Sequence, residues 1–174
     1  MGTSNIAKAL ESASLIQREV NDLFKPPSDT VASRSDPVIY TALVRNTRGY
    51  LEKVAHQING CYAEGWYDAS AVMVRRFVET LIIECFEFHQ IQQKIKDSNG
   101  DYFYLRDLID HACSETKWTL GRNVRKALPK LKDIGDKSAH SRRYNAHRED
   151  IDKVIDDLRE VTQELIALAN LKQI

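Results

Sequence analysis

The sequence predicts an all-α protein, and three observations lead to this fold class. Apolar residues recur at three- and four-residue steps over most of the 174 residues, which places them on one face of successive helices. Glycine and proline number only 7 and 4, too few for the turns of a many-stranded sheet. Hydrophobic residues make up 43% of the chain, enough for a core and too many for a disordered protein. We therefore expect a single helical domain over residues 1–174.

The N-terminal helix is expected within residues 1–24, where the apolar residues share one face. Pro26 and Pro27 end this helix, and residues 25–36 form a polar linker rich in Ser and Pro. The remaining residues, 37–174, are expected to form a helical bundle.

The second helix is predicted to start at the Asp36-Pro37 cap and to stop at Asn59-Gly60. A third helix should begin at Asp68, which can act as its cap, and reach about Lys96. It contains the most apolar stretch of the chain, although Glu79, Glu84 and Glu87 interrupt that stretch. We therefore predict a long, central, apolar helix.

The second half of the chain is predicted to contain shorter elements and one long helix. Residues 97–100 have the composition of a turn, and a short helix should follow from Tyr102 to Cys113. After Thr119 we expect short helical pieces that break at Gly121 and Pro129. The final helix, from about Glu149 to the end, is amphipathic, with apolar residues at coiled-coil-like spacing.

The formal net charge is zero, but the charge is unevenly distributed along the chain. Residues 117–148 carry ten Lys and Arg against two acidic residues, whereas residues 149–160 carry six acidic residues against two basic ones. So basic a segment fits a polyanionic partner. It equally fits two neighbouring helices whose opposite charges compensate each other.

The three cysteines, Cys61, Cys85 and Cys113, are odd in number and widely spaced, which predicts free thiols in a reducing compartment. The sequence shows no secretory signal pattern and no stretch apolar enough to cross a bilayer. We therefore expect a cytoplasmic protein that does not enter a membrane. The sequence has no phosphate loop, Cys-x-x-Cys pair or calcium loop, and no cofactor is expected.

One segment, residues 131–147, concentrates residue types that suit RNA backbone cleavage. Asp136 and His140 are four residues apart and would share a helical face, and Arg142 and Arg143 follow closely. A carboxylate so placed can orient an imidazole as general base, while arginines stabilise phosphate charge. The candidate catalytic residues are His140, Asp136, Arg142 and Arg143.

The same segment supplies the candidate RNA-binding residues, which are Lys132, Lys137, Arg142, Arg143 and His147. A structural interpretation stays open beside the catalytic one. In it Asp136 caps a helix, His140 bonds within the bundle, and the two arginines pair with the acidic last helix. No metal site is expected, because Asp136, His140 and His147 do not have the spacing of a ligand set.

A second polar group lies in the apolar third helix. Arg76 and Glu79 are three residues apart and Arg75 and Glu79 are four apart, so a pair within the helix is available. Charges in so hydrophobic a helix are costly unless they are paired. We interpret Arg76 and Glu79 as a structural polar pair.

Two segments, Ala71-Val-Met-Val-Arg-Arg-Phe-Val-Glu79 and Ile134-Gly-Asp-Lys-Ser-Ala-His140, together with the amphipathic last helix, resemble a bacterial branch of the HEPN superfamily. The resemblance covers roughly residues 36–174. That branch consists mainly of domains of unknown function, often encoded beside restriction and defence genes. The resemblance implies a HEPN-like bundle, a homodimer and a partner protein encoded nearby. In many members it also implies metal-independent RNA cleavage by an Arg-polar-x-x-x-His motif from each protomer.

In this motif His140 matches the histidine and Asp136 the polar residue, whereas Gly135 occupies the arginine position. A second formal match, from Arg142 to His147, has Arg143 at the polar position. The resemblance thus implies an RNA- or nucleotide-engaging domain, and an endoribonuclease of a defence or toxin–antitoxin type if it is an enzyme. The alternative is a non-catalytic helical module for protein interaction or dimerisation. Gly135 favours this alternative, because glycine suits a close approach of two helices.

Overall fold

The computed structural model describes residues 11–16 and 37–172. Contacts divide the chain into two units, Met1–Val31 and Ala32–Ile174, which are described separately. In the first unit residues 11–16 are helical, while the rest of the predicted N-terminal helix and the 25–36 linker lie outside the described residues. About 70% of the described residues are helical and none belongs to a strand, which confirms the all-α prediction.

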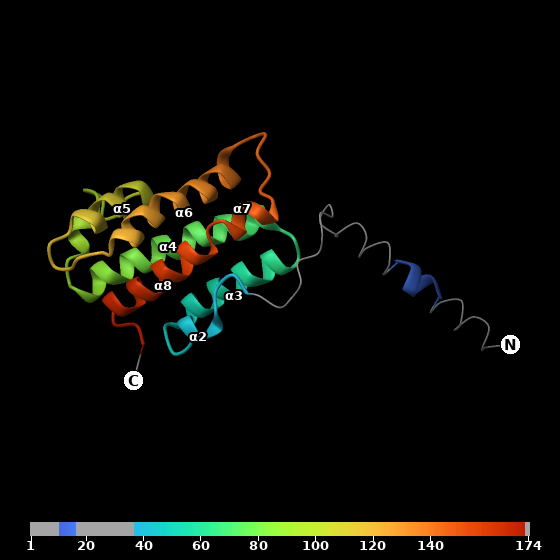
Figure 1. Cartoon of the computed structure of the whole chain (residues 1–174), viewed down its shortest axis with the longest axis horizontal. Coiled ribbons are helices and arrows are strands. Elements are labelled where there is room, and N and C mark those ends of the chain that lie inside the picture. The colour runs from blue at the N-terminus through green and yellow to red at the C-terminus, as the bar shows by residue number, and fades with distance from the viewer. Residues whose placement is uncertain (1–10, 17–36, 173–174) are drawn as a thin grey trace. The chain divides into compact units, whose positions relative to one another are not determined.

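The second unit is organised around its longest helix, α4 (Tyr67–Phe88). This helix packs against α3 (Gly49–Ala63), α6 (Arg122–His140) and α8 (Ile155–Leu168). In Figure 1, α3 and α6 lie on opposite sides of α4. Removing each large apolar side chain of the shared core from water contributes about 1.5–3 kcal/mol. The largest side chains that α4 buries completely are Phe77, Leu81, Ile82 and Phe86.

Four shorter elements complete this unit. They are α2 (Thr41–Val44), η1 (Gln92–Ile95), α5 (Leu105–Ser114) and α7 (Arg148–Asp152). In Figure 1, α5 and α7 lie toward opposite ends of the unit. Of the helices in the described ranges, none combines the length and the apolar composition needed to cross a membrane.

The predicted second helix is in fact two helices, and Asn59-Gly60 does not end it. The helical backbone begins at Thr41, breaks after α2, and continues in α3 through Gly60 to Ala63. The amide of Asn59 is engaged elsewhere: its Oδ1 accepts from the Ile39 nitrogen at 2.9 Å, and its Nδ2 donates to the Ile39 oxygen at 2.8 Å. Asn59 therefore joins two segments through tertiary hydrogen bonds instead of stopping a helix.

The predicted limits of the third helix also need correction. Asp68 does not cap α4 but lies in its first turn, where its Oδ1 accepts from the Ala146 nitrogen at 3.0 Å. The helix ends at Phe88 and not near Lys96. Gln90 adopts a left-handed conformation with φ 57°, which reverses the backbone and prevents further α-helix.

The region predicted as broken helical pieces is one continuous helix, α6. Gly121 is its N-cap, as a break would require, but Pro129 lies inside the helix. An internal proline costs about 3 kcal/mol because it removes a hydrogen bond and crowds the preceding turn. Burial of apolar side chains along the whole of α6 outweighs this cost, and these side chains include Val124, Leu128 and Leu131.

The remaining elements follow the prediction more closely. The turn at residues 97–100 is confirmed by a hydrogen bond of 3.1 Å from the Gly100 nitrogen to the Asp97 oxygen. The helix expected from Tyr102 begins at Leu105. The last helix is divided into α7 and α8, because residues 153 and 154 form a turn instead of continuing the α-helix.

Among the described glycines, Gly135 leaves the least space for a Cβ atom, and it lies where α6 meets α4. A Cβ atom at this position would lie 2.4 Å from the Arg75 Cβ and 3.0 Å from the Ala71 oxygen. The first distance is too short for a real contact and the second is unusually tight, and neither neighbouring atom is the end of a flexible side chain. The absence of a side chain at residue 135 therefore sets the distance between the two helices.

We predict that Gly135→Ala lowers the free energy of unfolding by about 2–3 kcal/mol, because the added methyl group forces α6 away from α4. Gly60→Ala is the matched control, since Gly60 is helical and a Cβ there meets nothing within 4 Å. It should raise stability by about 0.5–1 kcal/mol through helix propensity alone. Urea denaturation of both variants tests this, and equal effects of the two substitutions would contradict the close approach.

Candidate nucleic-acid interface

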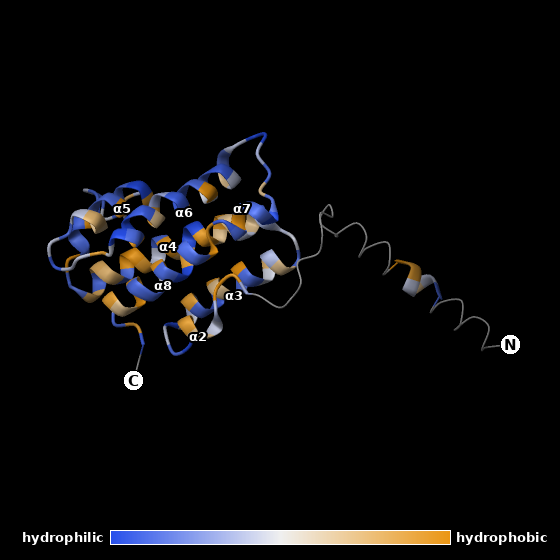
Figure 2. Cartoon of the chain, in the orientation of Figure 1, coloured by the Kyte–Doolittle hydropathy of each residue, from blue (hydrophilic) through white to orange (hydrophobic). Residues whose placement is uncertain are grey.

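The solvent side of α6 is rich in basic residues, while its large apolar side chains are buried in the core. Figure 2 shows hydrophilic residues along most of the visible ribbon of this helix. We call its exposed row of basic residues the basic face, which consists of Arg122, Arg125, Lys126, Lys130, Lys137 and His140. At 1.5 Å per residue the row extends over roughly 27 Å, with Asp133 as the acidic residue within it.

Two further cations continue the basic face beyond the end of α6. Arg142 and Arg143 are exposed in the segment that leads to α7. This segment is fixed at both ends, because the Ser141 nitrogen bonds the Lys137 oxygen and the Ala146 nitrogen bonds Asp68. The arginines are therefore held near the C-terminal end of α6.

The acidic helix α8 compensates one edge of the basic face. Lys130 Nζ lies 2.7 Å from Asp157 Oδ2, and the Gly121 nitrogen donates to Glu164 Oε1 at 2.6 Å. Asn123 also bonds Glu160 at 3.1 Å. The charge compensation that the sequence left open is thus present on this edge. This compensation does not extend to every cation. Within the described part of the chain, five of them form no ion pair: Arg122, Lys126, Lys137, Arg142 and Arg143.

Asp136 does not orient His140, contrary to the expectation from their spacing. Its Oδ1 accepts from Arg75 Nε at 2.7 Å and its Oδ2 from Lys132 Nζ at 2.5 Å. Burial by itself would raise the pKa of Asp136, but the hydrogen bonds from these two cations lower the pKa below its ordinary value. Asp136 therefore anchors α6 to α4, and within the described residues no hydrogen bond or ion pair joins it to His140.

The polar pair on α4 involves Arg75 and not Arg76. Arg75 reaches Glu79 at 3.4 Å as well as Asp136, so that it links the two helices. Arg76 is exposed and lies on another side of the helix. Arg75 and Glu79 are four residues apart and lie on the face of α4 that meets α6. This position explains why Arg75 forms the pair that was predicted for Arg76.

The remaining predicted residues lie on α6 and at the start of α7. His140 is the last residue of α6 and is exposed. Lys132 forms an ion pair with Asp136. His147 is exposed at the start of α7, where its backbone nitrogen donates to Asp150 Oδ2 at 3.1 Å. That hydrogen bond is the main reason why the pKa of Asp150 is lowered. His140, Arg142 and Arg143 are thus all exposed at or just after the C-terminal end of α6.

Sequence reasoning missed a buried carboxylate on α4. Glu84 is only 5% exposed, and it accepts hydrogen bonds from Arg48 Nε at 2.8 Å and from the Tyr50 hydroxyl. Burial raises the pKa of Glu84, and the Arg48 guanidinium offsets part of this rise. The signal was an acidic residue within the most apolar stretch, which implies a partner elsewhere in the fold.

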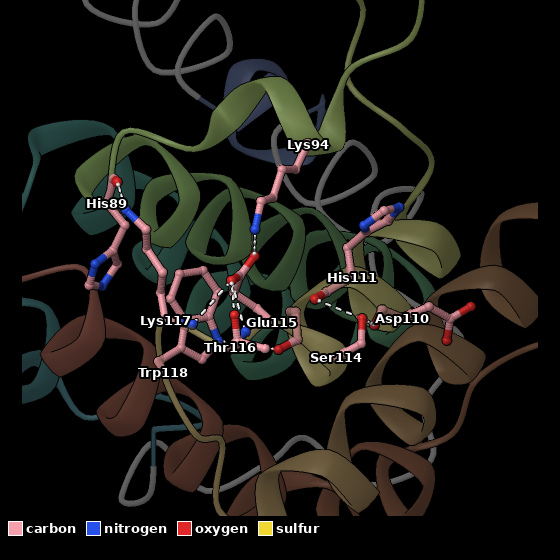
Figure 3. Close-up of polar contacts among 10 residues, drawn as sticks. His89, Lys94, Asp110, His111, Ser114, Glu115, Thr116, Lys117 and Trp118 are labelled. Carbon is pink, nitrogen blue, oxygen red and sulfur yellow. Dashed lines mark hydrogen bonds and ion pairs between the residues drawn. The ribbon is translucent and has the colours of Figure 1, made fainter.

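A second missed carboxylate, Glu115, holds the turn after α5 (Figure 3). It accepts from Lys94 Nζ at 2.8 Å and from the backbone nitrogens of Thr116 and Lys117 at 2.8 and 3.1 Å. Hydrogen bonds from Lys94 and these nitrogens lower the pKa of Glu115 to about 2. Its contacts are all within the fold, so its role is structural.

Residues 11–16 and 37–172 contain possible metal ligands and thiols. No group of three or more His, Cys, Asp or Glu side chains there is placed to hold a metal ion. The three cysteines are free thiols, and burial raises the pKa of Cys85 to about 12, so it stays protonated.

No family model, curated protein or solved structure matches this chain. The candidate site is accordingly defined by the chain's own residues, namely the cations of α6 and of the segment after it.

Glu115 gives a pH-dependent contribution to stability. Its pKa in the folded protein, about 2, is below its ordinary value of 4.5, so folding favours the charged carboxylate. The contribution is complete above pH 4.5 and decreases as the pH falls toward 2. We predict that the wild type loses about 2 kcal/mol more than Glu115→Gln between about pH 7 and pH 3, measured by urea denaturation. Parallel pH profiles for the two proteins would contradict this role.

Proposed function

We propose that this domain binds RNA through the basic face of α6 and through Arg142 and Arg143. The observation that carries the proposal is a row of exposed cations that α8 compensates along one edge only. Lys and Arg side chains of this kind gain free energy from phosphate contacts by releasing the counterions of the nucleic acid. The HEPN resemblance of residues 71–79 and 134–140 supports RNA over other polyanions.

The dimensions of the basic face suit a short stretch of nucleic acid. A row of roughly 27 Å matches about eight stacked nucleotides of one strand at 3.4 Å each. The flanking arginines extend this track past the end of the helix. Arginine binds phosphate in a bidentate manner, so these two residues should contribute strongly to affinity.

A finer proposal is that the domain also cleaves RNA without a metal, as the HEPN resemblance implies. His140 would act as general base, and Arg142 or Arg143 would stabilise the phosphorane. The exposure of all three at the end of α6 supports this assignment. In a homodimer two such sets would meet in one groove. Asp136 would then act only indirectly, by holding α6 in position through its contacts with Arg75 and Lys132.

The second candidate function is a non-catalytic module for protein interaction, and a specific observation favours it. Gly135 and Asp136, which lie within the motif-like segment, both serve the contact between α6 and α4. A segment with this structural role needs no catalytic explanation. In this case the basic face would dock an acidic protein, and RNA would not bind.

We predict that Arg142→Glu with Arg143→Glu weakens binding to labelled single-stranded RNA by at least tenfold at low salt. The slope of log K against log salt should fall by about 1.4, because two phosphate contacts are lost at about 0.7 each. Fluorescence anisotropy over a salt series measures both quantities. The matched control is Arg45→Glu with Lys53→Glu, which makes the same change of charge on exposed residues in and before α3.

Each outcome of this experiment distinguishes the candidates. Equal losses in both double variants would indicate a general charge effect instead of a site. Absence of RNA binding by the wild type at low salt would favour the interaction module.

For cleavage we predict that His140→Ala lowers the rate by about 10²–10⁴-fold in EDTA at saturating RNA, because general-base catalysis is lost and saturation removes any effect of weaker binding. His56→Ala is the control, since His56 is also exposed but lies on α3. Gel analysis of end-labelled RNA gives the rate. A wild type that binds RNA and leaves it intact would reduce the function to binding.

A further inference from the structure

A cavity of about 260 Å³ opens beside the basic face, between the C-terminal half of α6 and the connection of α7 to α8. Two buried apolar side chains line it, Ile134 from α6 and Val154 from the connection. Tyr144, from the segment between α6 and α7, lines it too and is partly exposed. The cavity thus combines apolar surface with one aromatic ring.

Tyr144 is half-buried, and its side chain packs against the hydrophobic core of the unit. Burial, followed by the charge and the hydrogen bond of Asp150, raises the pKa of this tyrosine to about 12. Asp150 is in turn held by the backbone nitrogen of His147 at 3.1 Å. A ring held in place by packing loses little further freedom when a planar ligand stacks on it.

The polar residues of the cavity connect it with the proposed RNA track. Lys130, Asp133 and Lys137 lie on the solvent side of α6 and also line the cavity. Lys153 lines it from the other side and lies 3.8 Å from Asp150. Because Lys130 is paired with Asp157, Lys137 is the α6 cation that remains available to a phosphate beside the cavity.

We propose that this cavity receives one unstacked base of a single-stranded RNA whose phosphates follow the basic face. This inference rests on the proposed function and adds the substrate class to it. The cavity is slightly smaller than the ligand sites of about 300–1,000 Å³ that take drug-sized molecules, so it suits one base and not a base pair. Single-stranded RNA can turn a base outward onto an aromatic side chain, whereas a duplex holds its bases stacked.

Asp133 and Asp150 both line the cavity, and Asp133, on the α6 side, indicates which bases fit. Asp133 is exposed, and its carboxylate can only accept hydrogen bonds while it is ionised. Cytosine and adenine carry an amino group that donates to such an oxygen, but uracil presents a carbonyl there. Bases with an exocyclic amino group are therefore favoured.

The test compares oligocytidine with oligouridine of equal length on the full chain, by anisotropy at fixed salt. Both have the same phosphate charge, so a difference between them does not come from phosphate contacts. We expect tighter binding of oligocytidine, and about a tenfold loss of its affinity in Tyr144→Ala, since stacking on an aromatic residue is lost. Tyr104→Ala is the control, because Tyr104 is 82% exposed and precedes α5 at the other end of the unit.

A second variant, Asp133→Asn, covers the case in which Tyr144→Ala does not fold. It changes an exposed residue and should reduce the preference for cytidine over uridine severalfold. Equal binding of both oligomers by the wild type, or RNA affinity unchanged in Tyr144→Ala and Asp133→Asn, overturns the base site but leaves RNA binding intact. A wild type that binds neither oligomer overturns the proposed function together with the base site.

Discussion

The contact between α4 and α6 at Gly135 is the constraint on which the rest of the second unit depends. Residue 135 has no side chain, and its neighbour Asp136 draws Arg75 and Lys132 into one ion-pair group beside the contact. Steric fit and charge pairing thus act at the same place. The rotation of α6 about its own axis is fixed by this contact, and that rotation decides which cations face solvent.

The same rotation explains how opposite charges are divided between α6 and α8. The edge of α6 that turns toward α8 meets Asp157, Glu160 and Glu164, and part of the basic charge is neutralised there. The outward side of α6 lies beyond the reach of these acids. A chain with zero net charge can therefore carry a strongly basic surface, and composition alone does not reveal it.

The helical class followed from periodicity, but the limits of the helices depended on tertiary contacts. Pro129 and Gly60 both carry a local signal for a helix end, and packing overrides each of them. At the candidate site, spacing could place Asp136 and His140 on adjacent turns, yet it could not show that Arg75, 61 residues away, would claim the carboxylate. The role of Gly135 was the more predictable part, since only a close approach requires a residue without a side chain.

The double hydrogen bond of Asn59 to Ile39 has a consequence for the chemical ageing of the protein. Asparagine is thermolabile, and its hydrolysis to aspartate would replace the donating Nδ2 by an oxygen. That oxygen would face the Ile39 carbonyl, which now accepts a hydrogen bond of 2.8 Å, and two acceptors would repel each other. Loss of a single amide nitrogen would thus loosen the entry of the chain into α2.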